Sequence, residues 1–243
     1  ADHSLFKPSF GQLSDLVQLV YLDHRGCGRS EHGLVTSWNL AQWGDDVLGF
    51  CEALGIEQPI VFGGSFGGQV ALSFATRYPT KVRKLILECT TAKMEIEVVL
   101  NAFERLGGIE ARRIAEDRWL RPSKETRARY LQVCVPLYTA RVHIDPDAER
   151  RTIRNDELAL HFSSQDGEFL KFDYRADLRR ILCPTLVMAG DRDPITPMTF
   201  SETIVANLPE HLIRFERFPG CGHGPTDDDP IHAFAVIRDF IQS

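Results

Sequence analysis

Residues 59–78 read PIVFGGSFGGQVALSFATRY, and their character changes around Ser65. Pro59 to Phe62 is a short apolar run of the kind that forms a buried strand. Phe66 to Tyr78 carries apolar side chains at helical spacing. The glycines between these two segments predict a sharp turn from a strand into a helix, which would hold the Ser65 hydroxyl above the end of a sheet.

Further strands and helices are expected on both sides of this turn. Short apolar runs closed by turn residues predict strands at Leu16–Leu22, Lys84–Leu87, Thr185–Ala189 and Leu212–Phe218. Helical periodicity predicts helices at Trp38–Leu54, Phe66–Tyr78, Thr199–Leu208 and Ile231–Ile241. Because parallel strands need crossover connections, this alternation predicts an α/β fold with a mostly parallel sheet flanked by helices.

The stretch from about Met94 to Asp173 interrupts the alternation. It is rich in arginine and glutamate, has helical periodicity and contains no obvious strand. We expect a helical cap at residues 93–173, inserted between a first core part at 1–92 and a second at 174–243. Such a cap would lie over the carboxyl ends of the strands, where open α/β sheets bind ligands.

Composition narrows the class of protein. The 243 residues are 43% hydrophobic and 26% charged, with a formal net charge of −6, which disfavours nucleic acid and acidic membranes as partners and favours a small-molecule substrate. No apolar run is long enough to span a membrane. Six cysteines stand singly, which predicts free thiols in a reducing compartment and hence a cytoplasmic location. The oligomeric state is not predicted.

Ser65 has partners of the right chemistry elsewhere in the chain. A hydroxyl nucleophile needs a general base, and the base needs a carboxylate to fix its tautomer. His223 follows the strand that ends near Phe218, and Asp193 follows the strand that ends at Ala189. Because parallel strands end at one edge of a sheet, Ser65, Asp193 and His223 are expected to meet as a catalytic triad.

Neighbouring residues have expected roles in the same chemistry. The glycines two positions before and after Ser65, Gly63 and Gly67, are expected to remove Cβ atoms that would collide in the turn. The N–H of Phe66 is expected to donate to the oxyanion. Asp191 is expected to shape its turn, and Glu88, at the end of an earlier strand, remains an alternative acid.

Two phosphate-binding interpretations of the glycine-rich segments fail. A P-loop would need lysine and serine or threonine where Gln69 and Val70 stand. A dinucleotide motif starting at Gly26 would have Glu31 in place of its third glycine. We find no spacing typical of a metal site, and acyl transfer from Ser65 needs no metal or organic cofactor.

Four segments together make the sequence resemble the α/β-hydrolases, and among them the proline iminopeptidase-like branch. They are Asp23–Ser30, Gly63–Gly68, Gly190–Pro194 and Gly222–His223. The resemblance covers the chain from about Leu16 to its end, apart from the insertion. It implies the α/β-hydrolase fold and a serine hydrolase that acts through an acyl-enzyme, with the family's chain order of serine, aspartate and histidine.

The resemblance also implies segments that the sequence does not contain. Members of this branch usually carry two or three further N-terminal strands and an H-G-G-P-G loop that supplies a second oxyanion donor. This loop would end immediately before Ala1. We therefore expect the working protein to be longer than the sequence given.

The substrate is predicted from the insertion, where alternatives stay open. An apolar roof would favour an ester or lactone, and its candidate residues are Phe103, Trp119, Tyr130, Leu137, Tyr138 and Phe162. The same side chains would alternatively be the insertion's own core. An aminopeptidase would need carboxylates for the substrate ammonium, and the candidates are Glu95, Glu97, Glu104, Glu110 and Glu157, which would alternatively form a solvated face. A ligand-binding receptor without catalysis is the third possibility.

Overall fold

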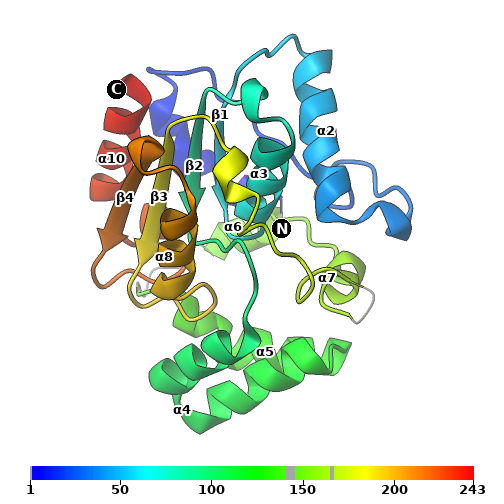
Figure 1. The fold of residues 1–243 in the computed structure, drawn as a ribbon. Coiled ribbons are helices and arrows are strands. Elements are labelled where there is room, and N and C mark those ends of the chain that lie inside the picture. Colours follow the sequence, from blue (N-terminus) through cyan, green and yellow to red (C-terminus); the bar gives the residue numbers. More distant parts are fainter. Residues whose placement is uncertain (1, 141–145, 165–166) are drawn as a thin grey trace.

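The computed structural model describes residues 2–140, 146–164 and 167–243, and its centre is a parallel sheet (Figure 1). The sheet has four strands in the order β1-β2-β3-β4. Their bounds are β1 Ile60–Gly64, β2 Lys84–Glu88, β3 Thr185–Gly190 and β4 Ile213–Phe218. All three neighbouring pairs are parallel, which confirms the predicted α/β class.

Helices occupy the intervals between the strands. Outside the 93–173 segment they are α1 Lys7–Phe10, α2 Leu40–Ala53, α3 Phe66–Arg77, α8 Met198–Asn207, α9 Pro225–Asp228 and α10 Pro230–Gln242. The four helices predicted from periodicity are α2, α3, α8 and α10. Their ends follow the capping chemistry of the sequence, since Asn39 caps α2 and Asp229 caps α10, each by accepting a backbone N–H of its first turn.

One predicted strand is wrong. Residues Leu16–Leu22 contain no strand, and β1 pairs only with β2 among the residues that the structure describes. Val17, Leu19 and Tyr21 still pack against the apolar cluster that contains Phe10 and Phe234. Their alternating apolar pattern therefore reports burial of one side of the segment, while a strand also requires a hydrogen-bonding neighbour.

Alternate side chains of the strands pack on opposite faces of the sheet. Leu85, Leu87 and Val187 belong to a cluster with residues of α3 and α8. Ile86 and Met188 belong to a second cluster with residues of α1 and α10. Figure 1 shows α3 and α8 on the near face of the sheet and α10 on the other. This period of two is what a strand buried on both faces requires.

Among its described residues, the segment from 93 to 173 contains helices and none of the named strands. They are α4 Ile96–Leu120, α5 Lys124–Val133, α6 Pro146–Arg151 and α7 Asp156–Phe162. An antiparallel bridge between Lys93 and Asp173 joins the two ends of the segment. Figure 1 shows α4 and α5 beyond the carboxyl ends of the strands, and α4 changes direction at Gly108, where φ is 74°.

The state of the cysteines and the character of the helices agree with what the composition predicts. All six cysteines are buried and none forms a disulfide bond, as predicted. Within the described ranges, we find no helix that combines the length and the apolar character needed to cross a membrane.

The turn from β1 into α3 holds Ser65 in a strained backbone conformation, with φ 52° and ψ −122°. The Ser65 N–H donates to the Glu88 carbonyl at 2.9 Å. A Cβ at Gly63 would lie 2.5 Å from the Gly67 carbonyl oxygen, so the collision expected there is present. The expectation for Gly67 is wrong, because a Cβ there would meet nothing within 4 Å. The second close approach is made instead by Gly68, against Thr90.

These spacings predict opposite effects for two neighbouring glycines. Gly63→Ala should lower the free energy of unfolding by about 1–3 kcal/mol or more, because a backbone carbonyl cannot move aside. Gly67→Ala has room and lies in a helix, so it should be neutral or raise that free energy by up to about 1 kcal/mol. Urea unfolding of both variants measures the difference, and equal losses would contradict the geometry.

Candidate active site

Ser65, His223 and Asp193 lie in one hydrogen-bonded chain at the carboxyl edge of the sheet. His223 Nε2 is 2.8 Å from Ser65 Oγ, and His223 Nδ1 is 2.7 Å from Asp193 Oδ2. The three side chains come from the turns after β1, β4 and β3. The geometry is that of a nucleophile, a base and a group that orients the base.

Asp193 is fully buried and heavily hydrogen-bonded. The backbone N–H groups of Ile195 and Thr196 each donate to Oδ1 at 2.8 Å, and the Thr196 hydroxyl donates to Oδ2 at 2.5 Å. Burial by itself raises the pKa of Asp193, but the attraction of His223 and these hydrogen bonds outweigh it and hold the pKa below its usual value. Asp193 is therefore kept ionised beside the imidazole.

The two turns that carry Asp193 and His223 touch through glycine. A Cβ at Gly190 would lie 2.1 Å from the Gly222 carbonyl oxygen, and a Cβ at Gly222 would lie 2.1 Å from the Tyr138 carbonyl oxygen. The His223 N–H also donates to the Tyr138 carbonyl at 2.6 Å. Glycine at 190 and 222 thus lets three pieces of backbone meet, one of them from the helical segment.

Two residues that brace this arrangement were not anticipated from the sequence. Thr196 contacts both Asp193 and, at 3.2 Å, His223 Nδ1. Asp228 accepts from the N–H of Gly222 at 2.6 Å and from the Thr139 hydroxyl at 2.6 Å. A polar residue three positions after a candidate acid is a recognisable signal for Thr196, whereas Asp228 stands in a run of three aspartates that does not single it out.

The alternative acids are used differently. The Asp191 carboxylate accepts from the Gly220 N–H at 2.8 Å, so it shapes the turn as expected. Glu88 is buried and accepts from the backbone N–H and hydroxyl of Thr226 at 2.7 and 3.0 Å. Burial raises the pKa of Glu88 to about 7, against these two hydrogen bonds. The carboxylate bonded to His223 is that of Asp193.

The residues considered for the roof all belong to one apolar cluster, which the helical segment shares with α2 and α3. Two of them reach the site directly. The Tyr138 ring lies 5.1 Å from the His223 ring, and the Phe162 ring lies 5.2 Å from that of Phe66, the residue after Ser65. The cluster is at once the core of the segment and an aromatic wall beside the candidate nucleophile.

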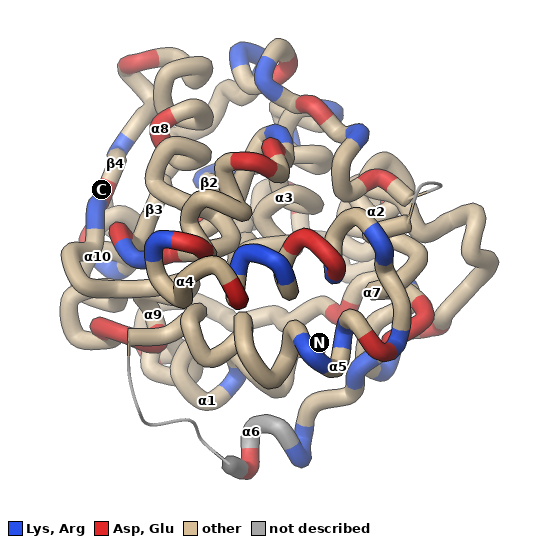
Figure 2. Tube along the Cα trace, turned by 90° about the horizontal axis from the view of Figure 1, so that it is seen from below, with Lys and Arg blue, Asp and Glu red and all other residues tan. Residues whose placement is uncertain are grey.

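The five glutamates considered for a substrate ammonium are all exposed. Glu97 and Glu104 pair with Arg112, and Glu95 pairs with Arg175. Figure 2 shows acidic and basic residues interspersed along α4. These carboxylates form a solvated surface, as the alternative interpretation holds.

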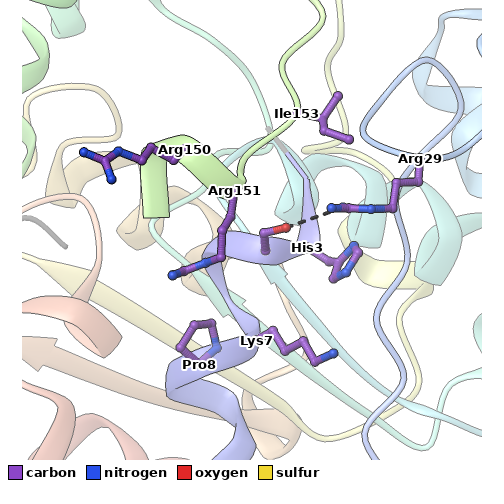
Figure 3. A pocket seen from close by; sticks show the side chains of 8 residues that line it. His3, Lys7, Pro8, Arg29, Arg150, Arg151 and Ile153 are labelled. Atoms are coloured by element: carbon purple, nitrogen blue, oxygen red, sulfur yellow. Dashed lines mark hydrogen bonds between the residues drawn. The ribbon is translucent and has the colours of Figure 1, made fainter. Parts of the chain in front are cut away.

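A separate hollow of about 940 Å³ lies beside the N-terminal helices (Figure 3). Its lining is strongly basic and consists of His3, Ser4, Lys7, Pro8, Arg29, Arg150, Arg151 and Ile153. Arg29 donates to Asp2 at 2.7 Å, so its charge is compensated within the protein. None of the candidate active-site residues lines this hollow.

Two groups of side chains in the described part of the chain are close enough to share a metal ion. One is Cys89, Asp193 and His223, and the other is Asp2, His3 and Asp23. In the first, Asp193 and His223 bond to each other, and in the second, His3 Nδ1 bonds to Asp23. The ligand atoms are thus already in use, and neither group is assigned to a metal.

Comparison with known proteins identifies the family. The model of the alpha/beta hydrolase family matches residues 3–237. The chain belongs to that family. A proline iminopeptidase from Pestalotiopsis fici is 30% identical over 82% of this chain and 73% of its own length. The 3-oxoadipate enol-lactonase 1 of Acinetobacter baylyi is 28% identical over 83% of this chain and 71% of its own length.

Solved structures agree on the fold of this alpha/beta hydrolase. The proline iminopeptidase of Mycobacterium smegmatis superimposes with a TM-score of 0.79 at 23% identity, covering 99% of this chain and 85% of the other. The expected relationship to the proline iminopeptidases is thereby confirmed. The named relatives are all hydrolases, which supports a hydrolase function here.

Glu88 provides a pH-dependent test of the packing beneath the site. A carboxyl group with a pKa of about 7 when folded and 4.5 ordinarily binds more proton in the folded state between these values. Its contribution to stability therefore falls as the pH rises from about 4.5 to about 7, and changes no further above that. Glu88→Gln should shrink the loss of unfolding free energy between pH 5 and pH 8, measured by urea unfolding. Glu110→Gln, at an exposed position, is the control, and an unchanged pH dependence in Glu88→Gln would refute the assignment.

Proposed function

We propose that this alpha/beta hydrolase is a serine hydrolase that cleaves a small carboxylic ester or lactone. The observation that carries the proposal is the continuous hydrogen-bond chain from Asp193 through His223 to Ser65. His223 Nε2 takes the proton as Ser65 Oγ attacks the substrate carbonyl, and returns it to the leaving alcohol. Water activated by the same nitrogen then releases the acid. Asp193 holds the imidazole and stabilises its cationic form.

We assign the hydrogen bond that stabilises the developing oxyanion to the N–H of Phe66. Phe66 is the first residue of α3, so its N–H has no acceptor within the helix. It also lies at the positive end of the helix dipole, beside the oxygen that forms the new bond. The reaction as proposed needs no cofactor.

Residues 93–173 act in this proposal as a cap between the core parts 1–92 and 174–243. Tyr138 and Phe162 bring the cap against His223 and Phe66, so an acyl group bound to Ser65 would meet aromatic side chains. Burial of apolar surface favours an acyl chain over a free ammonium. The 28% identity to an enol-lactonase supports the same choice. Six buried cysteines without a disulfide bond support the cytoplasmic location.

A proline iminopeptidase activity is the second candidate, favoured by the relationship to those enzymes. The exposure of all five cap glutamates considered for an ammonium argues against it. A purely binding role is disfavoured by the hydrogen-bonded chain at Ser65, which a receptor does not need.

A hydrolysis panel tests the proposal. p-Nitrophenyl esters and acyl lactones should be cleaved faster than a proline arylamide, measured as kcat/KM. Ser65→Ala should lower kcat by about a thousandfold or more, and Asp193→Asn by a comparable factor, because each removes one member of a unit. Ser9→Ala, remote from the site, is the matched control and should be unaffected. Hydrolysis that survives Ser65→Ala would exclude the mechanism, and a preference for the arylamide would select the iminopeptidase.

A further inference from the structure

Arg118, in the last turn of α4, is a buried cation with an unused donor. The residue is 4% exposed, and its Nη1 has no hydrogen-bond partner. Its Nη2 reaches the Ala159 carbonyl at 3.4 Å, and its guanidinium lies 4.6 Å above the Trp119 ring. The indole Nε1 of Trp119 is also buried and without a partner. Two unsatisfied N–H donors therefore occur on adjacent residues.

A buried cation of this kind lowers the stability of the folded protein when no anion is near it. An arginine stays protonated, and a buried charge without a counter-ion is strongly unfavourable. Among the described residues, no carboxylate forms an ion pair with Arg118. Two other arginines of the same segment do form ion pairs, Arg112 with Glu97 and Arg127 with Asp156. Arg118 is more deeply buried than these two arginines and lacks the counter-charge that they have.

Arg118 and Trp119 are connected to the candidate active site on two sides through contacting rings. On one side, the Trp119 ring stacks on Phe169 at 4.2 Å, Phe169 lies 5.9 Å from Phe162, and Phe162 lies 5.2 Å from Phe66. These four aromatic rings thus lead from Arg118 to the proposed oxyanion donor.

The second series leads to the base. The Trp119 ring lies 5.5 Å from Tyr130, Tyr130 lies 6.3 Å from Tyr138, and Tyr138 lies 5.1 Å from His223. The hydroxyls of the two tyrosines bond to each other at 2.5 Å. They are neutral groups and do not supply the counter-charge that Arg118 lacks. One series of rings thus connects Arg118 with Phe66, the residue after Ser65, and the other connects it with His223, which bonds to Ser65.

We propose that Arg118 and Trp119 bind a carboxylate on the acyl part of the substrate, so that the enzyme acts on esters or lactones of dicarboxylic acids. This rests on the ester or lactone hydrolysis proposed above. The two oxygens of a carboxylate match the two unpartnered N–H donors, and the anion supplies the missing counter-charge. A substrate with a free ammonium at this end would be repelled.

The test compares charged and neutral acyl groups. p-Nitrophenyl half-esters of glutaric to suberic acid are assayed against the same compounds with the distal carboxyl methylated, after subtraction of the rate without enzyme. Wild-type kcat/KM should be at least about tenfold higher for the best half-ester than for its methylated partner. Arg118→Met should reduce this ratio by roughly ten- to a hundredfold, the range for a lost charge-assisted hydrogen bond, without lowering kcat/KM for the neutral ester. Arg113→Met, exposed on the same helix, should leave the ratio unchanged.

The outcomes separate this inference from the function on which it rests. If wild type hydrolyses both members of each pair equally, and Ser65→Ala abolishes both, the carboxylate site is wrong and the serine hydrolase stands. If no ester is hydrolysed, the proposed function fails first. Should Arg118→Met not fold, Trp119→Phe keeps an aromatic ring but removes the indole N–H together with the five-membered ring, and it should lower the ratio several-fold. An unchanged ratio in a folded Trp119→Phe would then overturn the site.

Discussion

The candidate site depends on the close approach of two backbone turns. The turn after β4 comes so near the end of β3 that Gly190 has no room for a side chain, and the backbone at Tyr138 leaves none at Gly222. This contact sets the distance between Asp193 and His223, and the backbone of Tyr138 then fixes His223 from the other side. Hydrogen bonds alone would not hold that spacing, because side chains can turn, whereas backbone packed against backbone cannot.

The buried ionisable side chains differ in how many hydrogen-bond partners the protein gives them. Asp193 receives three donors besides His223, which is the degree of solvation that a buried carboxylate needs. Glu88 receives two from one residue, and burial keeps its pKa near neutrality. Arg118 has one weak acceptor and an aromatic face. The contrast locates the place where a ligand can add stabilisation that the protein does not supply.

The sequence was sufficient for the parts that local chemistry controls. The turn at Ser65 follows from glycines between a strand pattern and a helix pattern, and Asp193 and His223 follow from the rule that parallel strands end at one edge. Residues Leu16–Leu22 were misassigned because alternation reports burial but not pairing. Thr196 has a local signal, its place three residues after Asp193. Asp228 has none, because its role depends on contacts with Gly222 and with Thr139 of the helical segment. The openness around Gly67 could not be predicted either, since the spacing of a motif does not reveal which of its glycines is crowded.

The helical segment has two physical tasks that compete. Phe103 and Tyr130 are almost completely buried in a cluster that also contains Trp43 of α2 and Val70 of α3, so the same packing anchors the segment to the sheet and lines the approach to His223. Truncating such side chains costs about 3–5 kcal/mol, a large part of the stability of a domain. Among the roof residues, Trp119, Leu137 and Tyr138 are only partly buried, so substrate preference can change there at a smaller cost in stability. Trp119 contacts Arg118, and Tyr138 contacts His223.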